Sequence, residues 1–432
     1  MHKHWIGAGS CAFALLVAMG IARADNRACA APDVRHVAVP LDYARPQGGQ
    51  FDLAYRLRPG SGAVRPLVIV IPGGPGGTLI REDRNVLSGG IPDDVPVVLT
   101  DPRGAGCNDD PRLTEDRDFT SEWLARDLLA IVADMERGRG ERLDYILYGQ
   151  SYGTVEATIA AAIAGRESRT PPRALVMEGT LGHAFTSYEQ QFSAFQAEWH
   201  AQRDALPLRW QQLIRTGAFH DALGSNSLTW ARLIDRSILR GYHADGDSDL
   251  EEQLASDVLL FRSLRSIGRT PYGDERAGES RLLRVIACEE LTGDLYPGRD
   301  MRGGELVLTG SDACAGSRRL VRPYNAAQWP VAAPIVYFQG LHDAATPPAQ
   351  ARYHFDVERG APRWLVTVDR AGHSVLSVTL AVGDCRDGLW GAIGSDLGRL
   401  PAAAKACDAL LQDAHVSVEH RDAVVLPLRQ GP

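Results

Sequence analysis

A serine within a Gly-x-Ser-x-Gly pattern is the side chain most suited to chemistry in this chain. The pattern is Gly149-Gln150-Ser151-Tyr152-Gly153. The β-rich run 143–148 precedes it, and the Ala- and Ile-rich run 154–165, whose composition favours a helix, follows it. A sharp turn from strand to helix leaves little room for a Cβ beside the serine, so the flanking glycines suit it. We therefore expect Ser151 to lie at such a turn with its hydroxyl exposed.

A serine hydroxyl is a weak nucleophile unless a base removes its proton and an acid orients that base. In a doubly wound α/β sheet, these partners follow the serine in the order acid, histidine, on loops after later strands. Asp343 follows the apolar run 334–338, and His373 comes after the next strand-like run. We predict that Ser151, Asp343 and His373 form a catalytic triad.

Two neighbouring residues compete for the roles of acid and base. Asp369 is closer than Asp343 to His373 along the chain, and His342 could replace His373 as the base. A lone aspartate in a loop more often caps a turn, and a lone histidine more often lies on the surface. The order of the residues and their positions after strands favour Asp343 and His373.

A glycine-rich segment could stabilise the negative charge that develops in the reaction. Pro72-Gly73-Gly74-Pro75-Gly76-Gly77 follows the apolar run 67–71 directly. Backbone N–H groups held in such a loop can donate to an oxyanion without rearranging. We expect an oxyanion hole made by the amides of Tyr152 and Gly74. The segment has neither of the glycine patterns that hold nucleotide phosphates, so we predict no nucleotide cofactor.

The elements that must position these residues follow an alternation of strands and helices. The runs 34–40 and 51–57 alternate apolar and polar residues, which is typical of an antiparallel hairpin. Continuous apolar runs then predict central parallel strands, at 67–71, 95–99, 173–177 and 334–338. Apolar residues at helical spacing predict a helix through Leu124, Leu128, Ile131, Val132 and Met135, closed by Gly138. The fold class is therefore α/β, with a doubly wound and mostly parallel sheet.

The alternation is interrupted for about 150 residues by segments with helical patterns, which we interpret as an inserted helical cap. The chain then divides into a signal peptide (1–24), the first part of the core (25–181), the cap (182–330), the second part of the core (331–384) and a C-terminal extension of the core (385–432).

The N-terminus is typical of a secretory signal peptide. Lys3 and His4 precede the apolar run 6–22, and Ala22-Arg23-Ala24 fits a cleavage site after Ala24. A membrane anchor is the alternative, but the run is short and contains several glycines. We expect a secreted or periplasmic protein without stable membrane insertion after cleavage.

Six cysteines remain after cleavage, and an even number in an exported chain favours disulfides. Of the 15 possible sets of three disulfides, proximity in sequence suggests Cys288 with Cys314 and Cys385 with Cys407, which leaves Cys29 with Cys107. No pair has C-x-x-C spacing, so we predict no metal site.

The formal charge of −8 becomes −8 − 2 = −10 without Lys3 and Arg23, so we expect no nucleic-acid partner.

The chain resembles the α/β-hydrolase fold exopeptidases of the proline iminopeptidase and tripeptidyl aminopeptidase group, especially the secreted tripeptidyl aminopeptidase-like branch. The segments that carry the resemblance are, in order, 39–43, 72–77, 101–106, 149–154, 340–347 and 372–373. The resemblance implies an α/β-hydrolase fold and the roles assigned above to Ser151, Asp343, His373, Gly74 and Tyr152. It also implies that residues are removed from a peptide N-terminus, without a cofactor.

Exopeptidases of this group resemble one another in using cap carboxylates to hold the free ammonium of the substrate, because a buried cation needs a charged partner. Glu289, Glu290 and Glu178 are the candidates. Pro72 stands where many iminopeptidases have His, which favours the tripeptidyl branch. We expect Arg103 to form a structural ion pair. A carboxylesterase or lipase-like hydrolase with the same triad is the alternative, so the substrate is a peptide or a small ester.

Overall fold

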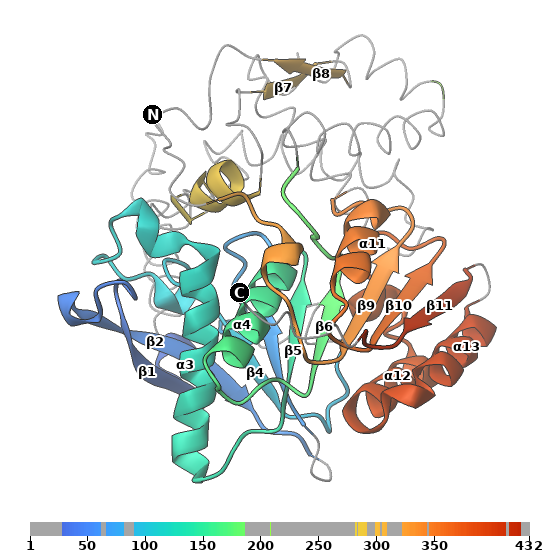
Figure 1. The fold of residues 1–432 in the computed structure, drawn as a ribbon, viewed down its shortest axis with the longest axis horizontal. Helices are drawn as coiled ribbons and strands as arrows, with labels where there is room; N and C mark the ends of the chain where they lie inside the picture. Colours follow the sequence, from blue (N-terminus) through green and yellow to red (C-terminus); the bar gives the residue numbers. More distant parts are fainter. Residues whose placement is uncertain are drawn as a thin grey trace, which may run out of the picture.

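A mostly parallel sheet lies at the centre of the protein (Figure 1). The computed structural model describes residues 28–61, 66–81, 90–185, 208, 281–282, 284–291, 299–302, 305–308, 322–343, 345–411 and 414–424. Within these residues the sheet has nine strands, in the order β1-β2-β4-β3-β5-β6-β9-β10-β11. The strands are β1 (Val34–Pro40), β2 (Gln50–Arg58), β3 (Leu67–Ile71), β4 (Val97–Thr100), β5 (Tyr145–Gln150), β6 (Ala174–Glu178), β9 (Ile335–Gly340), β10 (Arg363–Val368) and β11 (Val416–Arg421).

The strands from β4 to β10 in this order are parallel, and the two edges of the sheet are antiparallel. The predicted hairpin is the β1–β2 pair, and the predicted continuous apolar runs are the central strands. Strands β3, β4, β5, β6 and β9 are buried at every position. Such burial requires apolar side chains on both faces of each strand, as the sequence has. The predicted α/β fold class is confirmed.

Helices cover both faces of the sheet. The α-helices are α3 (Ser121–Arg139), α4 (Gly153–Arg166), α11 (Pro348–Val357), α12 (Gly383–Ser395) and α13 (Leu400–Leu410). Apolar side chains of α3, α4 and α11 belong to one core cluster, and those of α12 and α13 belong to a second cluster. Helix α3 continues through Gly138 to Arg139, and Gly140, with a φ of 73°, is its left-handed cap, so the predicted closing glycine, Gly138, is two residues too early.

Short 3₁₀ and π turns complete the described elements. They are η1 (Pro46–Gly48), η2 (Gly106–Asn108), η3 (Asp116–Phe119), η4 (Ile286–Glu290), η5 (Ala326–Gln328), η6 (Val375–Thr379) and η7 (Leu397–Arg399). The π turn η4 contains the candidates Glu289 and Glu290. The π turn η6 follows His373.

Three strands differ from the sequence-based expectations. The predicted helical cap contains the antiparallel pair β7 (Arg299–Arg302) and β8 (Glu305–Leu308), and the sequence places Gly303-Gly304 between them, a pair that suits a hairpin turn. Strand β11 lies in the predicted C-terminal extension and adds an antiparallel edge beside β10. Most of the cap, 186–280 except residue 208, lies outside the described residues.

The predicted pairs Cys29–Cys107 and Cys385–Cys407 are confirmed as disulfides. The first ties the N-terminal segment to η2, and the second joins α12 to α13. Cys288 is also disulfide-bonded, and its predicted partner Cys314 lies outside the described residues. None of the helices in the described part of the chain is long and apolar enough to span a bilayer. The predicted signal peptide, residues 1–24, also lies outside that part.

Candidate active site

Ser151 lies at a tight turn between β5, which ends at Gln150, and α4, which begins at Gly153. Its φ of 56° is in the left-handed region, where a residue with a side chain is strained. A Cβ at Gly149 would clash with the carbonyl oxygen of Gly153, and a Cβ at Gly153 would clash with that of Ile71. The turn therefore needs both glycines, as the sequence predicts.

Hydrogen bonds hold the backbone of this turn. The Ser151 N–H donates to the carbonyl oxygen of Glu178 over 2.8 Å, which joins the turn to the end of β6. The Ser151 carbonyl accepts from the N–H of Thr154 over 3.0 Å and from its hydroxyl over 2.6 Å. The strained backbone of Ser151 is thus held on both sides of its Cα, by its N–H and by its carbonyl.

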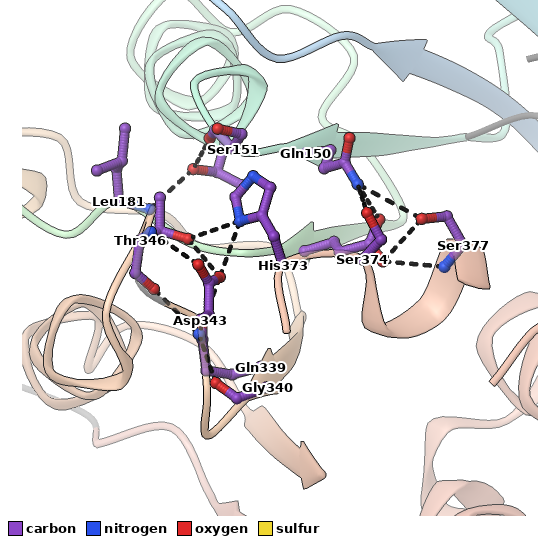
Figure 2. A network of polar contacts seen from close by, with 12 residues as sticks. Gln150, Ser151, Leu181, Gln339, Gly340, Asp343, Thr346, His373, Ser374 and Ser377 are labelled. Atoms are coloured by element: carbon purple, nitrogen blue, oxygen red, sulfur yellow. Dashed lines mark hydrogen bonds and ion pairs between the residues drawn. The ribbon is translucent and has the colours of Figure 1, made fainter. Parts of the chain in front are cut away.

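His373 and Asp343 form the second part of the site, and Figure 2 shows the imidazole between the Asp343 carboxylate and the turn at Ser151. Asp343 follows β9, and its Oδ2 lies 2.8 Å from His373 Nδ1. Both side chains are buried, at 2% and 5% exposure. Because the acid occupies Nδ1, the other ring nitrogen, Nε2, is left to serve as the base.

The environment favours a proton on His373. Burial lowers the pKa of His373, but the charge of Asp343, its hydrogen bond and the charge of Glu178 outweigh that effect and raise the pKa above its ordinary value. A base with a raised pKa accepts the serine proton more readily, provided that it is neutral at the working pH.

Thr346 holds the acid in place, and sequence reasoning missed it. Asp343 Oδ1 accepts from the Thr346 N–H over 2.9 Å, and Oδ2 accepts from its hydroxyl over 2.7 Å. Gln339 also donates to Oδ2, over 3.2 Å. The signal was available, because a threonine three residues after an aspartate is a common capping partner.

Gly179 is a second residue that sequence reasoning missed. It follows β6 with a φ of 58°, and a Cβ there would lie 2.7 Å from Cε1 and 2.8 Å from Nδ1 of His373. The imidazole therefore packs directly on the backbone of this glycine. The sequence offered only a glycine after a predicted strand, without indicating its neighbour.

The glycine-rich loop after β3 packs on the serine. A Cβ at Gly73 would lie 2.8 Å from the Ser151 Cβ, and the loop is closed by a bond of 3.0 Å from the Gly77 N–H to the Gly73 carbonyl. The residues that follow the loop are held by Asp101, whose Oδ1 accepts from the N–H groups of Leu79 and Ile80. Of the expected oxyanion donors, Gly74 follows Gly73, which packs on Ser151, and Tyr152 follows Ser151 itself.

The side chain of Tyr152 connects the site to the cap segment. Its hydroxyl lies 2.7 Å from Ser121 Oγ, and the Ser121 N–H donates to Glu290 Oε1 over 2.9 Å. Glu289 and Glu290 are both buried on η4. Burial raises the pKa of Glu290 to about 7.

The position of Glu178 does not suit a carboxylate that binds a substrate ammonium. It is the last residue of β6, it is fully buried, and its two oxygens accept from Tyr148, Gln150 and Ser377. The structure therefore places Glu178 beneath the site, where its oxygens are already bonded, and we withdraw it from the ammonium-binding candidates.

The alternative acid and base lie outside the triad geometry. Asp369 Oδ1 accepts from the N–H of His415 over 2.7 Å, next to β11. His342 is exposed, and its N–H donates to the Ala371 carbonyl.

The predicted ion pair of Arg103 is confirmed: its guanidinium is fully buried and makes two bonds, of 2.6 and 2.7 Å, to Asp127. Within the described residues, no three His, Cys, Asp or Glu side chains gather in a way that could hold a metal ion.

A comparison with protein families agrees with this architecture. A family model described as "alpha/beta hydrolase fold" matches residues 66–378. No curated protein sequence matches the chain. Similar solved structures include a proline iminopeptidase from Mycobacterium smegmatis, with 14% identity, a TM-score of 0.46, and coverage of 86% of this chain and 100% of that one. Others are a hydrolase from Pseudomonas aeruginosa (17%, TM-score 0.44, coverage 85% and 99%) and a thermophilic esterase from Thermogutta terrifontis (16%, 0.40, 85% and 99%). At these identities and TM-scores, none of these likenesses carries a conclusion about this chain.

Proposed function

Because this chain belongs to the alpha/beta hydrolase fold family, we propose that it is a serine hydrolase that releases residues or short peptides from peptide N-termini. The observation that carries the proposal is the pairing of a strained turn at Ser151 with a buried His373–Asp343 bond of 2.8 Å. Strand ends on one side of a parallel sheet supply all three groups, which is where ligands bind in such sheets.

The reaction follows from these positions. His373 Nε2 takes the hydroxyl proton as Ser151 Oγ attacks the carbonyl carbon, and the backbone amides of Gly74 and Tyr152 stabilise the oxyanion. The intermediate collapses, the scissile C–N bond breaks, and His373 gives its proton to the leaving amine. Water then attacks the acyl-enzyme with His373 again acting as base, which releases the acid product and restores Ser151.

The choice of a peptide N-terminus is supported by the acidic pair on η4. Glu290 bonds to Ser121, and Ser121 contacts the hydroxyl of Tyr152, one of the two oxyanion residues. A substrate ammonium beside Glu290, whose pKa burial raises to about 7, would favour the ionised carboxylate and form a buried charge pair with it. Pro72, in place of the histidine of many iminopeptidases, supports release of more than a single proline.

Chromogenic substrates test this proposal. We expect cleavage of a tripeptidyl p-nitroanilide with a free amino group, little cleavage of its N-acetylated form, and no activity of Ser151→Ala on either. A fluorophosphonate probe should label Ser151. Hydrolysis of p-nitrophenyl acyl esters without any cleavage of free-amino peptidyl anilides would instead support the carboxylesterase alternative.

Glu290→Gln separates substrate binding from chemistry. It should raise KM for free-amino peptides about tenfold or more, because a charge-paired hydrogen bond contributes ~1.5–3 kcal/mol, and leave hydrolysis of an uncharged ester nearly unchanged. Glu358→Gln is the matched control, since burial also raises the pKa of Glu358 to about 7 while its Oε2 accepts from Val331 in another part of the core. Equal effects of the two substitutions would contradict a role for Glu290 in binding.

Export and the division into core and cap are further parts of the proposal. Export is supported by two disulfides at the predicted positions. Expression of the full chain should yield an exported protein whose N-terminal sequence begins at Asp25. A product that keeps residues 1–24 in the cytoplasm would contradict it. We also propose that residues 182–330 form the cap over the core.

A further inference from the structure

Glu178 is a buried acid to which neither the triad nor the oxyanion hole assigns a role. Its side chain is fully buried at the end of β6. Oε1 accepts from the N–H of Ser377 over 2.9 Å and from its hydroxyl over 3.0 Å. Oε2 accepts from the hydroxyl of Tyr148 over 2.6 Å and from the amide of Gln150 over 3.1 Å. A carboxylate with four donors is held in one position.

These contacts join the two halves of the catalytic site. Gln150 directly precedes Ser151, and Ser377 belongs to η6, which begins two residues after His373. The main-chain carbonyl of Glu178 also accepts from the Ser151 N–H. Figure 2 shows Gln150, Ser374 and Ser377 gathered on one side of the imidazole, opposite to Asp343. Glu178 therefore links the nucleophile turn to the segment that carries the base.

The donors indicate that Glu178 is ionised. The N–H of Ser377 and the amide nitrogen of Gln150 can only donate, and they bond to different oxygens. A protonated acid would have to turn one of the remaining hydroxyls, of Tyr148 or Ser377, into an acceptor. The pKa of Glu178 is nevertheless raised above its ordinary value, because the effect of burial outweighs that of these hydrogen bonds and of the charge of His373.

His373 is the group that gains from this charge. Gly179, the residue after Glu178, packs against its imidazole, and the ring faces Asp343 on its other side. The titratable groups around Glu178 and His373 are Tyr148 on β5 and Asp343 after β9. Asp343 therefore bonds directly to a ring that becomes positive when it takes the serine proton, and the charge of Glu178 acts on that ring without a direct bond.

We propose that Glu178 is a positioning residue, whose ionised carboxylate holds the His373 segment against the strand that ends at Ser151 and stabilises the imidazolium formed in the reaction. This inference rests on the proposed function only in that His373 acts as the base. It replaces the substrate-binding role that the sequence suggested for Glu178.

The test is Glu178→Gln, which has nearly the same shape and no charge. In ¹⁵N-histidine-labelled protein the His373 ring is assigned by its loss in His373→Gln and titrated by NMR. We expect its pKa to fall by about one unit, the size typical of a nearby buried charge. The acid limb of the kcat/KM profile and of the fluorophosphonate labelling rate should move by the same amount.

Two further variants separate charge from packing. Ser374→Ala removes the hydroxyl that accepts from Gln150 over 3.1 Å but keeps Glu178, so it should leave the His373 titration at its wild-type value. Glu178→Asp keeps the charge on a shorter side chain, so it should keep the titration while kcat falls about tenfold through lost positioning. If Glu178→Gln does not fold, Glu178→Asp carries the test, and a wild-type kcat would overturn the proposal.

The outcomes test the role of Glu178 separately from the proposed aminopeptidase activity. The NMR titration and the labelling rate need no peptide substrate, so they remain informative even for an enzyme that cleaves only esters. A His373 titration that does not move in Glu178→Gln, with a folded protein and reduced activity, would show a purely structural role and overturn the proposal. A matching shift in both readouts, absent from Ser374→Ala, supports it.

Discussion

Replacing Gly179 by alanine tests how closely the backbone controls the position of the base. A Cβ at this position would lie 2.7 Å from Cε1 of His373, 2.8 Å from its Nδ1 and 3.0 Å from Thr346 Oγ1. Ordinary contacts of a Cβ begin at 3.4 Å, so the ring and the backbone must separate by 3.4 − 2.7 = 0.7 Å to reach one. The same substitution strains the backbone, because the φ of Gly179 is 58°.

The two effects have different sizes and different readouts. A catalytic group displaced by about 1 Å can cost ~100-fold in rate, which corresponds to about 2.7 kcal/mol of transition-state stabilisation. The left-handed backbone costs alanine ~1–2 kcal/mol of folding free energy. We therefore expect Gly179→Ala to lose about 100-fold in kcat/KM and to unfold at moderately lower urea concentration.

Gly140→Ala is the matched control. Gly140 also has a positive φ, of 73°, but a Cβ there would meet no atom within 4 Å, and it lies at the end of α3. It should show the same kind of stability loss in urea unfolding with wild-type kcat/KM and a wild-type labelling rate of Ser151. The reasoning is refuted if Gly179→Ala keeps activity within about threefold of wild type while its stability falls as in Gly140→Ala.

Three further predictions concern stability. Cys107→Ser opens a bond that joins residues 78 apart, so urea unfolding should show a loss of about 4 kcal/mol, and a loss under ~1 kcal/mol would contradict this. Arg103→Met leaves the buried Asp127 without its ion pair, and we expect a loss of ~3–5 kcal/mol that Arg103→Met with Asp127→Leu partly restores. The pKa of Glu358, about 7 in the folded chain against an ordinary 4.5, means that the folded state keeps a proton that the unfolded chain releases, so stability falls as pH rises from 4.5 to 7. Glu358→Gln should remove this contribution, roughly 3 kcal/mol, and unfolding curves whose pH dependence matches wild type would refute it.

The positions of the three candidate catalytic residues could be predicted because their order and context are local properties of the sequence. Ser151, Asp343 and His373 each follow a recognisable strand, and parallel strands bring their carboxyl ends to one edge of the sheet. The disulfide Cys385–Cys407 could be predicted from proximity in sequence, and Cys29–Cys107 was the pair that remained. The sheet topology therefore brings residues that are recognised separately in the sequence to one edge of the sheet.

The supporting groups could not be predicted, because they depend on side-chain directions across distant segments. Glu178 and Ser377 are separated by 199 positions, and nothing near Glu178 in the sequence indicates that its carboxylate points to η6 rather than to a substrate. Strand β11 was missed for a different reason: it is a half-exposed edge strand with a sequence, Val-Ser-Val-Glu-His-Arg, in which polar and charged residues obscure the alternation.

The charges of the site are distributed in a way that suits the reaction. In the proposed reaction the base becomes positive, Asp343 bonds to it, and the charge of Glu178 also raises its pKa. The oxyanion is negative, and the groups expected to face it are neutral amides. Glu290, which reaches Tyr152 through Ser121, has a pKa raised to about 7, so near neutrality much of it is uncharged until a cation lies beside it. In the proposed reaction, a substrate ammonium beside Glu290 would offset the charge of that carboxylate, and binding of a peptide N-terminus would be linked to the oxyanion site through Ser121 and Tyr152.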